Sequence, residues 1–149
     1  MTISDEPHGL LDSNILIYAD QELSPFHIQA KALRDKGVRG EIPLCVCPQV
    51  LLEFFAVVTN PRRVTNPLSP SEAMEEVKKY LRAKNILKIY PREDIIERIA
   101  DLSQKHRITG SRIFDLKLVA TMLSNGIRRL YTYNQDHFRD FEEIEVVVP

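Results

Sequence analysis

Glycine and cysteine are both scarce in this chain of 149 residues. The five glycines stand apart from one another, so the glycine-rich loops that bind dinucleotides or nucleoside triphosphates are missing. The two cysteines, Cys45 and Cys47, lie in an alternating apolar run, and two side chains on one face of a strand are poorly placed to bridge each other. We therefore expect both to be small buried hydrophobic residues. The four histidines are scattered singly, which argues against a zinc site.

An excess of charge of either sign is also lacking. The chain has 20 lysines and arginines against 21 acids, a formal net charge of -1, so nucleic-acid binding would depend on local basic patches. No apolar run approaches the roughly 18 residues of a membrane-spanning helix, and the first residues carry acids where a secretory signal has basic groups. These absences predict a cytoplasmic protein that does not contact a membrane.

The composition is that of an ordinary globular protein, with 44% hydrophobic and 28% charged residues. Its length matches the typical size of one domain, about 150 residues. Repeats, low-complexity tracts and flexible linkers are missing, and the proline-containing breaks are short enough to be turns. We therefore expect residues 1–149 to form a single domain.

Strands and helices alternate in the predicted secondary structure. A first strand begins at Leu10 and leaves toward a loop or helix at Asp12. Further strands are predicted over 42–47, 86–90, 129–133 and 144–148, and helices from Ser24-Pro25 to near Gly37 and over 49–59, 70–83 and 113–123. Pro91 introduces another helix, in which apolar residues repeat at helical spacing at 95, 96, 99 and 102. One side of the helix over 70–83 is expected to carry Met74, Val77, Lys78 and Leu81. The pattern predicts parallel pairing in an α/β sandwich with helices on both faces. Active groups in such proteins gather beyond the carboxyl ends of the strands.

Carboxylates interrupt four segments where the local pattern favours an apolar or neutral residue. Asp12 ends the first strand, Glu53 is the only polar residue among nine, Asp115 lies in an apolar helix, and Asp136 follows a late strand. Each has an ordinary alternative explanation: a helix cap for Asp12, a buried arginine partner for Glu53, a first-turn acid for Asp115 and a turn for Asp136.

Three embedded acids on separate elements also fit a shared cation whose charge offsets their repulsion. A cluster with oxygen ligands and no histidine or cysteine favours Mg²⁺ or Mn²⁺. Such sites typically serve phosphoryl chemistry, in which the metal activates water. Asp12, Glu53 and Asp115 are thus the candidate metal ligands.

The order of these residues resembles the PIN-domain family and, within it, the VapC-type toxins of bacterial toxin–antitoxin pairs. The resemblance extends from the run LLDSNILIYA at 10–19, through Glu53-Phe54 and the segment 59–61, to Phe114-Asp115 and the segment 131–134. It implies a three-layer α/β/α sandwich with a mainly parallel central sheet, and a metal-dependent endoribonuclease with Asp12, Glu53 and Asp115 as its first three acids. It further implies a homodimer and a small antitoxin that blocks the site.

The resemblance also assigns supporting polar residues. Asn14 matches the companion of the first acid, and Thr132 matches the hydroxyl near the fourth. Where many members have aspartate two residues after the threonine, this chain has Asn134, with Asp136 two further on. An amide oxygen ligates a metal without adding negative charge, so a second metal position is in doubt. We favour Asn134 over Asp136 at this fourth position.

Basic residues near the acids are candidates for holding RNA phosphates, and we favour Arg62 and Arg112. Two other classes of function remain open. One is a non-catalytic PIN-like module that binds RNA or acts as a scaffold, an alternative that Asn134 keeps open. The other is a receiver-type phosphoacceptor domain, although the chain has no lysine after Lys117, where that class needs one.

Overall fold

The computed structural model describes residues 6–149. Five three-residue strands form its sheet: β1 (Gly9–Leu11), β2 (Leu44–Val46), β3 (Ile86–Lys88), β4 (Arg129–Tyr131) and β5 (Glu145–Val147). They lie in the order β3-β2-β1-β4-β5, and every neighbouring pair is parallel. On the central strand β1, Leu10 is paired with Cys45 on one side and Leu130 on the other. The predicted parallel α/β architecture is confirmed.

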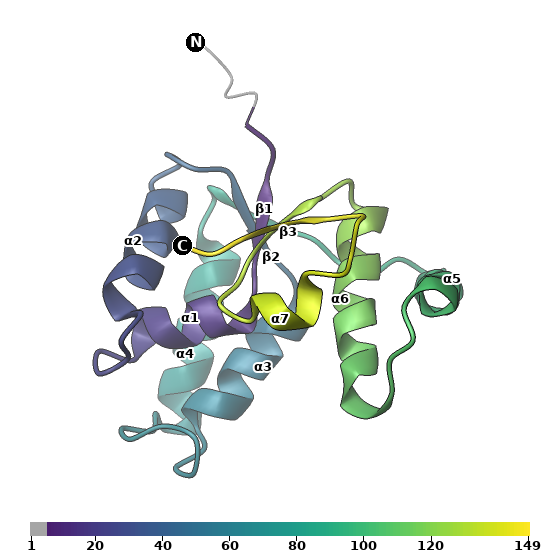
Figure 1. The fold of residues 1–149 in the computed structure, drawn as a ribbon. Helices are drawn as coiled ribbons and strands as arrows, with labels where there is room; N and C mark the ends of the chain where they lie inside the picture. The colour runs from purple at the N-terminus through teal and green to yellow at the C-terminus, as the bar shows by residue number, and fades with distance from the viewer. Residues whose placement is uncertain (1–5) are drawn as a thin grey trace.

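Helices cover both faces of this sheet (Figure 1). The segments that connect β1, β2 and β3 carry α1 (Ser13–Asp20), α2 (His27–Val38), α3 (Pro48–Val58) and α4 (Pro70–Arg82), which pack against one another. On the opposite side lie α5 (Ile95–Lys105) and α6 (Ile113–Ser124), preceded by the short 3-10 turn η1 (Gly110–Arg112). The last helix, α7 (Gln135–Phe138), follows β4. The molecule therefore has three layers, α/β/α.

Local sequence signals explain where several helices begin. Ser69 caps α4 in a reciprocal capping box with Glu72, and Pro70 occupies the first helical turn. Asp12 caps α1, because its side chain accepts a hydrogen bond from the Ser13 amide. Helix α1 thus starts directly after β1 and directs the following residues across the carboxyl edge of the sheet.

Several details differ from the sequence-based expectation. Helix α2 begins at His27 without a side-chain cap, and not at Ser24-Pro25 as predicted. Two strands end earlier than predicted, β4 at Tyr131 and β3 at Lys88. Helix α7 was not predicted, since four residues are too few to show a helical period. The face of α4 toward the core carries Ala73, Val77 and Tyr80, whereas Met74, Lys78 and Leu81, expected with Val77 on one side, are exposed.

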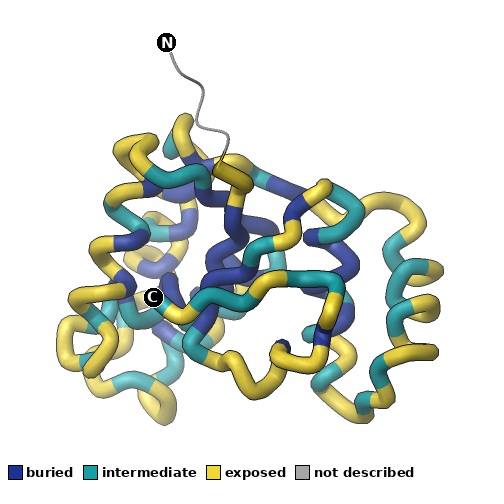
Figure 2. The backbone as a smooth tube through the Cα atoms, turned by 45° about the horizontal axis from the view of Figure 1, so that its top comes forward, coloured by how far each residue is buried: buried dark blue, intermediate teal, exposed yellow. Residues whose placement is uncertain are grey.

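The core lies along the central strands, where the backbone is almost continuously buried (Figure 2). Cys45 and Cys47 belong to it as free thiols, as predicted. Burial raises the pKa of Cys45 to about 12 and that of Cys47 to about 11, so both stay protonated and unreactive near neutral pH.

No helix within residues 6–149 has the length and apolar character needed to cross a bilayer. The expectation about the first residues falls partly on positions 1–5, which lie outside the described part of the chain.

Candidate active site

Asp12 lies at the carboxyl end of the central strand and is the most buried of the candidate acids, with 6% of its surface exposed. Its Oδ1 accepts a hydrogen bond from the Ser13 amide (2.7 Å) and its Oδ2 accepts one from the Thr132 hydroxyl (2.8 Å). Burial raises the pKa of Asp12 to about 6; these hydrogen bonds oppose the rise, and the charges of Glu53 and Asp115 add to it. Asp12 is therefore a buried carboxylate with two further acids, Glu53 and Asp115, nearby.

Thr132 and Asn14 fix the orientation of Asp12. Thr132 is fully buried directly after β4, and its hydroxyl also accepts hydrogen bonds from Asn14 Nδ2 (3.0 Å) and the Asn134 amide (2.9 Å). Asn14 Oδ1 accepts a hydrogen bond from the Tyr133 amide (3.1 Å). Side chains from the ends of two adjacent strands are thus joined in one network, which leaves Asp12 little rotational freedom.

Glu53 extends from α3 toward the same edge of the sheet. Its Oε2 accepts a hydrogen bond from Ser13 Oγ (3.0 Å) and its Oε1 accepts one from Gln49 Nε2 (2.9 Å). Gln49 Nε2 also donates to the Phe114 carbonyl at the start of α6 (2.9 Å). Within residues 6–149, no arginine or lysine pairs with Glu53, so the buried arginine partner that we considered from the sequence is not observed.

Asp115 lies in the first turn of α6 and is held by two basic side chains. Arg112 Nε is 3.2 Å from Asp115 Oδ2, and His137 Nδ1 is 3.2 Å from the same oxygen. The Arg112 guanidinium also donates to the His137 carbonyl (2.7 Å). This small network joins the start of α6 to α7 and places positive charge next to the third acid.

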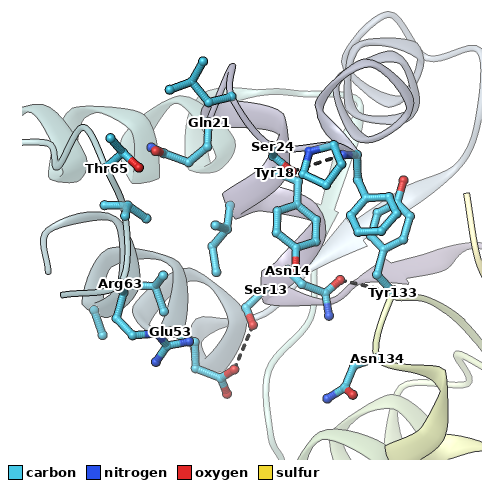
Figure 3. A pocket seen from close by; sticks show the side chains of 17 residues that line it. Ser13, Asn14, Tyr18, Gln21, Ser24, Glu53, Arg63, Thr65, Tyr133 and Asn134 are labelled. Carbon is cyan, nitrogen blue, oxygen red and sulfur yellow. Dashed lines mark hydrogen bonds between the residues drawn. The ribbon is translucent and has the colours of Figure 1, made fainter. Parts of the chain in front are cut away.

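The two candidates for the fourth position have different surroundings. Asn134 stands at the N-cap position of α7, makes no capping hydrogen bond with its side chain, and lines the same hollow as Ser13, Asn14 and Glu53 (Figure 3). Asp136, two residues further, is exposed and forms an ion pair with Arg139. This arrangement supports the choice of Asn134, and its role in metal binding stays a prediction.

The residues present fit a hard divalent cation. A buried carboxylate with two more acids near enough to raise its pKa offers the oxygen donors that Mg²⁺ or Mn²⁺ prefers, although Asp115 is also paired with Arg112 and His137. Among residues 6–149, however, no three acid, histidine or cysteine side chains are grouped as a ready-made metal cage. The donor set is therefore an open one, in which water and phosphate oxygens would complete the shell.

Sequence reasoning missed three residues that contact the acids: Ser13, Gln49 and His137. Gln49 stands four residues before Glu53 on a helix, a spacing that brings side chains together, so its contact with Glu53 had a detectable signal. The contact of Gln49 with Phe114 and that of His137 with Asp115 depend on the tertiary fold. Of the basic residues favoured from the sequence, Arg112 pairs with Asp115, and Arg62 is exposed on the loop after α3.

The fold and the site together define a parallel α/β protein with an acidic site at the carboxyl edge of its sheet. Residues 9–144 match the family model of the PIN domain, so the chain belongs to the PIN-domain family.

Similar proteins come from several bacteria. The chain is 32% identical over 133 residues to Ribonuclease VapC24 of Mycobacterium tuberculosis, covering 88% of this chain and 89% of the relative. The fold is similar to that of M. tuberculosis VapC20, described as a sarcin–ricin loop cleaving toxin, with a TM-score of 0.67, 18% identity and coverage of 94% and 98%. It is also similar to the DNA-bound VapBC structure from Salmonella typhimurium, with a TM-score of 0.62, 17% identity and coverage of 96% and 98%.

Proposed function

We propose that Asp12, Glu53 and Asp115 hold a divalent cation with which this PIN-domain protein, a ribonuclease of the VapC kind, hydrolyses RNA phosphodiester bonds. The observation that carries the proposal is the buried Asp12 carboxylate, which has two further acids nearby and, within residues 6–149, no cationic side chain bound to it. A buried charge without compensation is too costly for a purely structural role. The hydrolytic activity agrees with the names of the relatives.

Each residue around the acids has a distinct task in this proposal. A bound Mg²⁺ or Mn²⁺ would supply an activated water and neutralise charge that develops on the phosphate. Thr132 and Asn14 orient Asp12, and Ser13 and Gln49 hold the two oxygens of Glu53. Positioning of this kind matters because catalytic groups must be held in place before the reaction starts.

Arg112 and His137 both contact Asp115 Oδ2. Both groups carry or can carry positive charge, and both lie at the rim of the acidic site. They are therefore placed to contact a phosphate of the bound RNA once Asp115 is engaged elsewhere. Arg62 lies further out, on the exposed loop after α3, where it can add a peripheral phosphate contact.

The proposed function also implies partner proteins and a location in the cell. Solved structures with this fold include VapBC pairs of toxin and antitoxin, which supports a small antitoxin as partner of this chain. We also propose that the chain, acting as a single domain, forms a homodimer and works in the cytoplasm, where its RNA substrate is found. Each of these statements can be tested on the purified protein and on cell fractions.

The experiment that tests the function is RNA cleavage with and without Mg²⁺ or Mn²⁺. We expect cleavage only with metal, and none from Asp12→Ala, Glu53→Ala or Asp115→Ala. Asp101→Ala, which removes an exposed acid on α5, is the matched control and should cleave normally. Undiminished cleavage by Asp12→Ala, or cleavage that survives excess EDTA, would contradict the assignment.

A second measurement does not depend on activity. A cation that binds only the folded protein adds RT ln(1 + [L]/Kd) to its stability, so Mn²⁺ should raise the melting temperature of the wild type. The variant with all three acids replaced should not respond. If the wild type binds RNA, cleaves none and shows no Mn²⁺ response, the alternative of a non-catalytic RNA-binding module is correct instead.

A further inference from the structure

A groove with a volume of about 760 Å³ opens directly beside the acids and extends away from them (Figure 3). We call it the side groove. Ser13, Asn14, Glu53 and Asn134 line the end that adjoins the acids. The rest of the side groove is formed by residues that the proposed chemistry does not use, from α1 and the segment that follows it, from α3 and the loop that follows it, and by Tyr133.

One wall of the side groove is aromatic. Phe26 and Tyr133 are stacked with ring centroids 4.4 Å apart, and Tyr18 packs against both at 5.4 and 5.5 Å. Phe26 is 40% exposed although it belongs to this cluster. A large exposed aromatic residue held by its neighbours is typical of a binding surface, because its ring is already ordered before a ligand arrives.

The aromatic cluster is rigidly connected to the acids. Tyr18 lies on α1, the helix that Asp12 caps, and Tyr133 directly follows Thr132. His27 Nδ1 makes a hydrogen bond with the Tyr18 carbonyl (2.8 Å), and the Phe26 amide donates to Ser24 Oγ (3.2 Å). The distance between the aromatic wall and the acids is therefore set by the fold.

Among the described residues that line the side groove there is one arginine, which lies away from Tyr18 and Tyr133 (Figure 3). Arg63 lines the side groove from the loop after α3, together with Val64 and Thr65, and it is exposed. No hydrogen bond or ion pair of the Arg63 side chain is present within residues 6–149, whereas Arg112 is already bound to Asp115. Arg63 is therefore a cation at the groove that remains available for a ligand.

From these observations we infer that the side groove binds one unpaired nucleotide of the RNA next to the bond that is cut. Its base would stack on the wall formed by Phe26 and Tyr18, and its phosphate would contact Arg63. A nucleotide carries both a flat aromatic face and a negative charge, which matches the two walls of the groove. This inference rests on the proposed function, because the acids at the end of the groove define where the bond is cut.

Entry into the side groove requires an unpaired base. A base that is paired and stacked in a duplex must first be unpaired and unstacked to enter the groove, which costs free energy. The bases of a single strand or a loop are already unpaired. The substrate is therefore RNA that is single-stranded at this nucleotide, such as a loop or an unpaired tail.

Binding of a short fluorescent single-stranded RNA, measured by anisotropy in EDTA, tests the inference apart from cleavage. Phe26→Ala should weaken binding about 5- to 100-fold, the usual range for loss of one base-stacking residue. Tyr90→Ala removes an exposed aromatic residue outside the side groove and should bind as the wild type does. Phe26→Trp should restore affinity, because it keeps an aromatic surface.

Arg63→Gln supplies an independent measurement that does not alter the aromatic cluster. We expect weaker binding. We also expect the slope of log affinity against log salt concentration to fall in magnitude by about one, the contribution of one phosphate contact. Arg128→Gln, which changes an exposed arginine just before β4 at the opposite edge of the sheet, is its matched control. The same RNA annealed to its complement should bind more weakly to the wild type and respond less to Phe26→Ala.

Wild-type RNA affinity in both Phe26→Ala and Arg63→Gln overturns the inference and leaves the side groove to a polypeptide occupant. Equal weakening for single-stranded and duplex RNA also overturns it, because a duplex does not present an unpaired base. If the wild type cleaves no RNA, by contrast, the proposed function is refuted, and the binding of a nucleotide in the side groove is not. The two failures are therefore distinguishable.

Discussion

Gln49 offers a sharp test of how the acidic site is held together. Its amide nitrogen donates to Glu53 Oε1 and to the Phe114 carbonyl, both at 2.9 Å, so one side chain connects α3 to the first turn of α6. Those two helices carry Glu53 and Asp115. Loss of the Gln49 amide should therefore loosen the spacing between two of the three proposed metal ligands.

Replacement by methionine separates this positioning effect from a loss of stability. Gln49 Oε1 is buried without a partner within the described residues, so the wild type already bears the cost of one unsatisfied acceptor. Gln49→Met removes that acceptor along with the two donated bonds and keeps a similar volume. We expect the free energy of unfolding to change by about 1 kcal/mol or less.

The affinity for metal should change much more than the stability. Residues that orient a metal ligand typically account for about 10- to 100-fold in affinity, and Glu53 would keep only its hydrogen bond from Ser13. Calorimetric titration of the RNA-free protein with Mn²⁺ measures this change, and urea unfolding measures stability. Gln104→Met, on the exposed side of α5, is the matched control. Wild-type Mn²⁺ affinity in Gln49→Met would refute the positioning role.

Three further predictions concern other parts of the molecule. Asn134→Asp should tighten Mn²⁺ binding or create a second site in calorimetry, while Asp136→Asn should change little; loss of metal in Asp136→Asn alone would show that the fourth position belongs to Asp136. Burial alone raises the pKa of Glu143, but the hydrogen bond from His106 and the charges of His106 and Lys105 outweigh it and lower this pKa. The wild type should therefore lose this small contribution, below about 1 kcal/mol, as pH falls through the lowered pKa, and Glu143→Gln should flatten that part of the acid unfolding profile. Finally, a Cβ at Gly9 would lie 2.2 Å from Cε2 of the buried Tyr131, so Gly9→Ala should cost about 1–3 kcal/mol in denaturant unfolding; unchanged stability would mean that the Tyr131 ring moves aside without strain.

The sequence was sufficient for the order and type of most elements, because their signals are local. The capping box at Ser69, the proline at position 48 and the apolar run around Cys45 each determine structure within a few neighbouring residues. The three acids were also recognisable, since a charge inside an apolar segment stands out from its surroundings. The place of Asp12 at the carboxyl edge of the sheet followed from parallel pairing, which brings the carboxyl ends of strands to one edge, whereas Glu53 and Asp115 extend from helices.

Other features depend on distances in space that local sequence does not determine. Met74 and Ala73 are neighbours on α4, and only the packing of that helix decides that Ala73 is buried and Met74 partly exposed. Arg62 and Arg63 are identical residue types, and the path of their loop decides which one lines the side groove. The contact between Gln49 and Phe114 spans 65 positions, so no periodicity along the chain could reveal it.

The burial of Asp12 links the stability of the protein to its proposed function. Its pKa rises from 3.8 to about 6, which corresponds to about 3 kcal/mol lost from the stability of the metal-free protein once the carboxyl is ionised. Proteins are only marginally stable, so a loss of this size is a substantial fraction of the total. Buried Thr132 donates a hydrogen bond to Asp12, and partly buried Asn14 donates one to Thr132, so this network keeps Asp12 in its costly place. Under the proposed function, a cation bound at the same point would recover the lost stability by compensating the charge, so the feature that weakens the protein also favours metal binding.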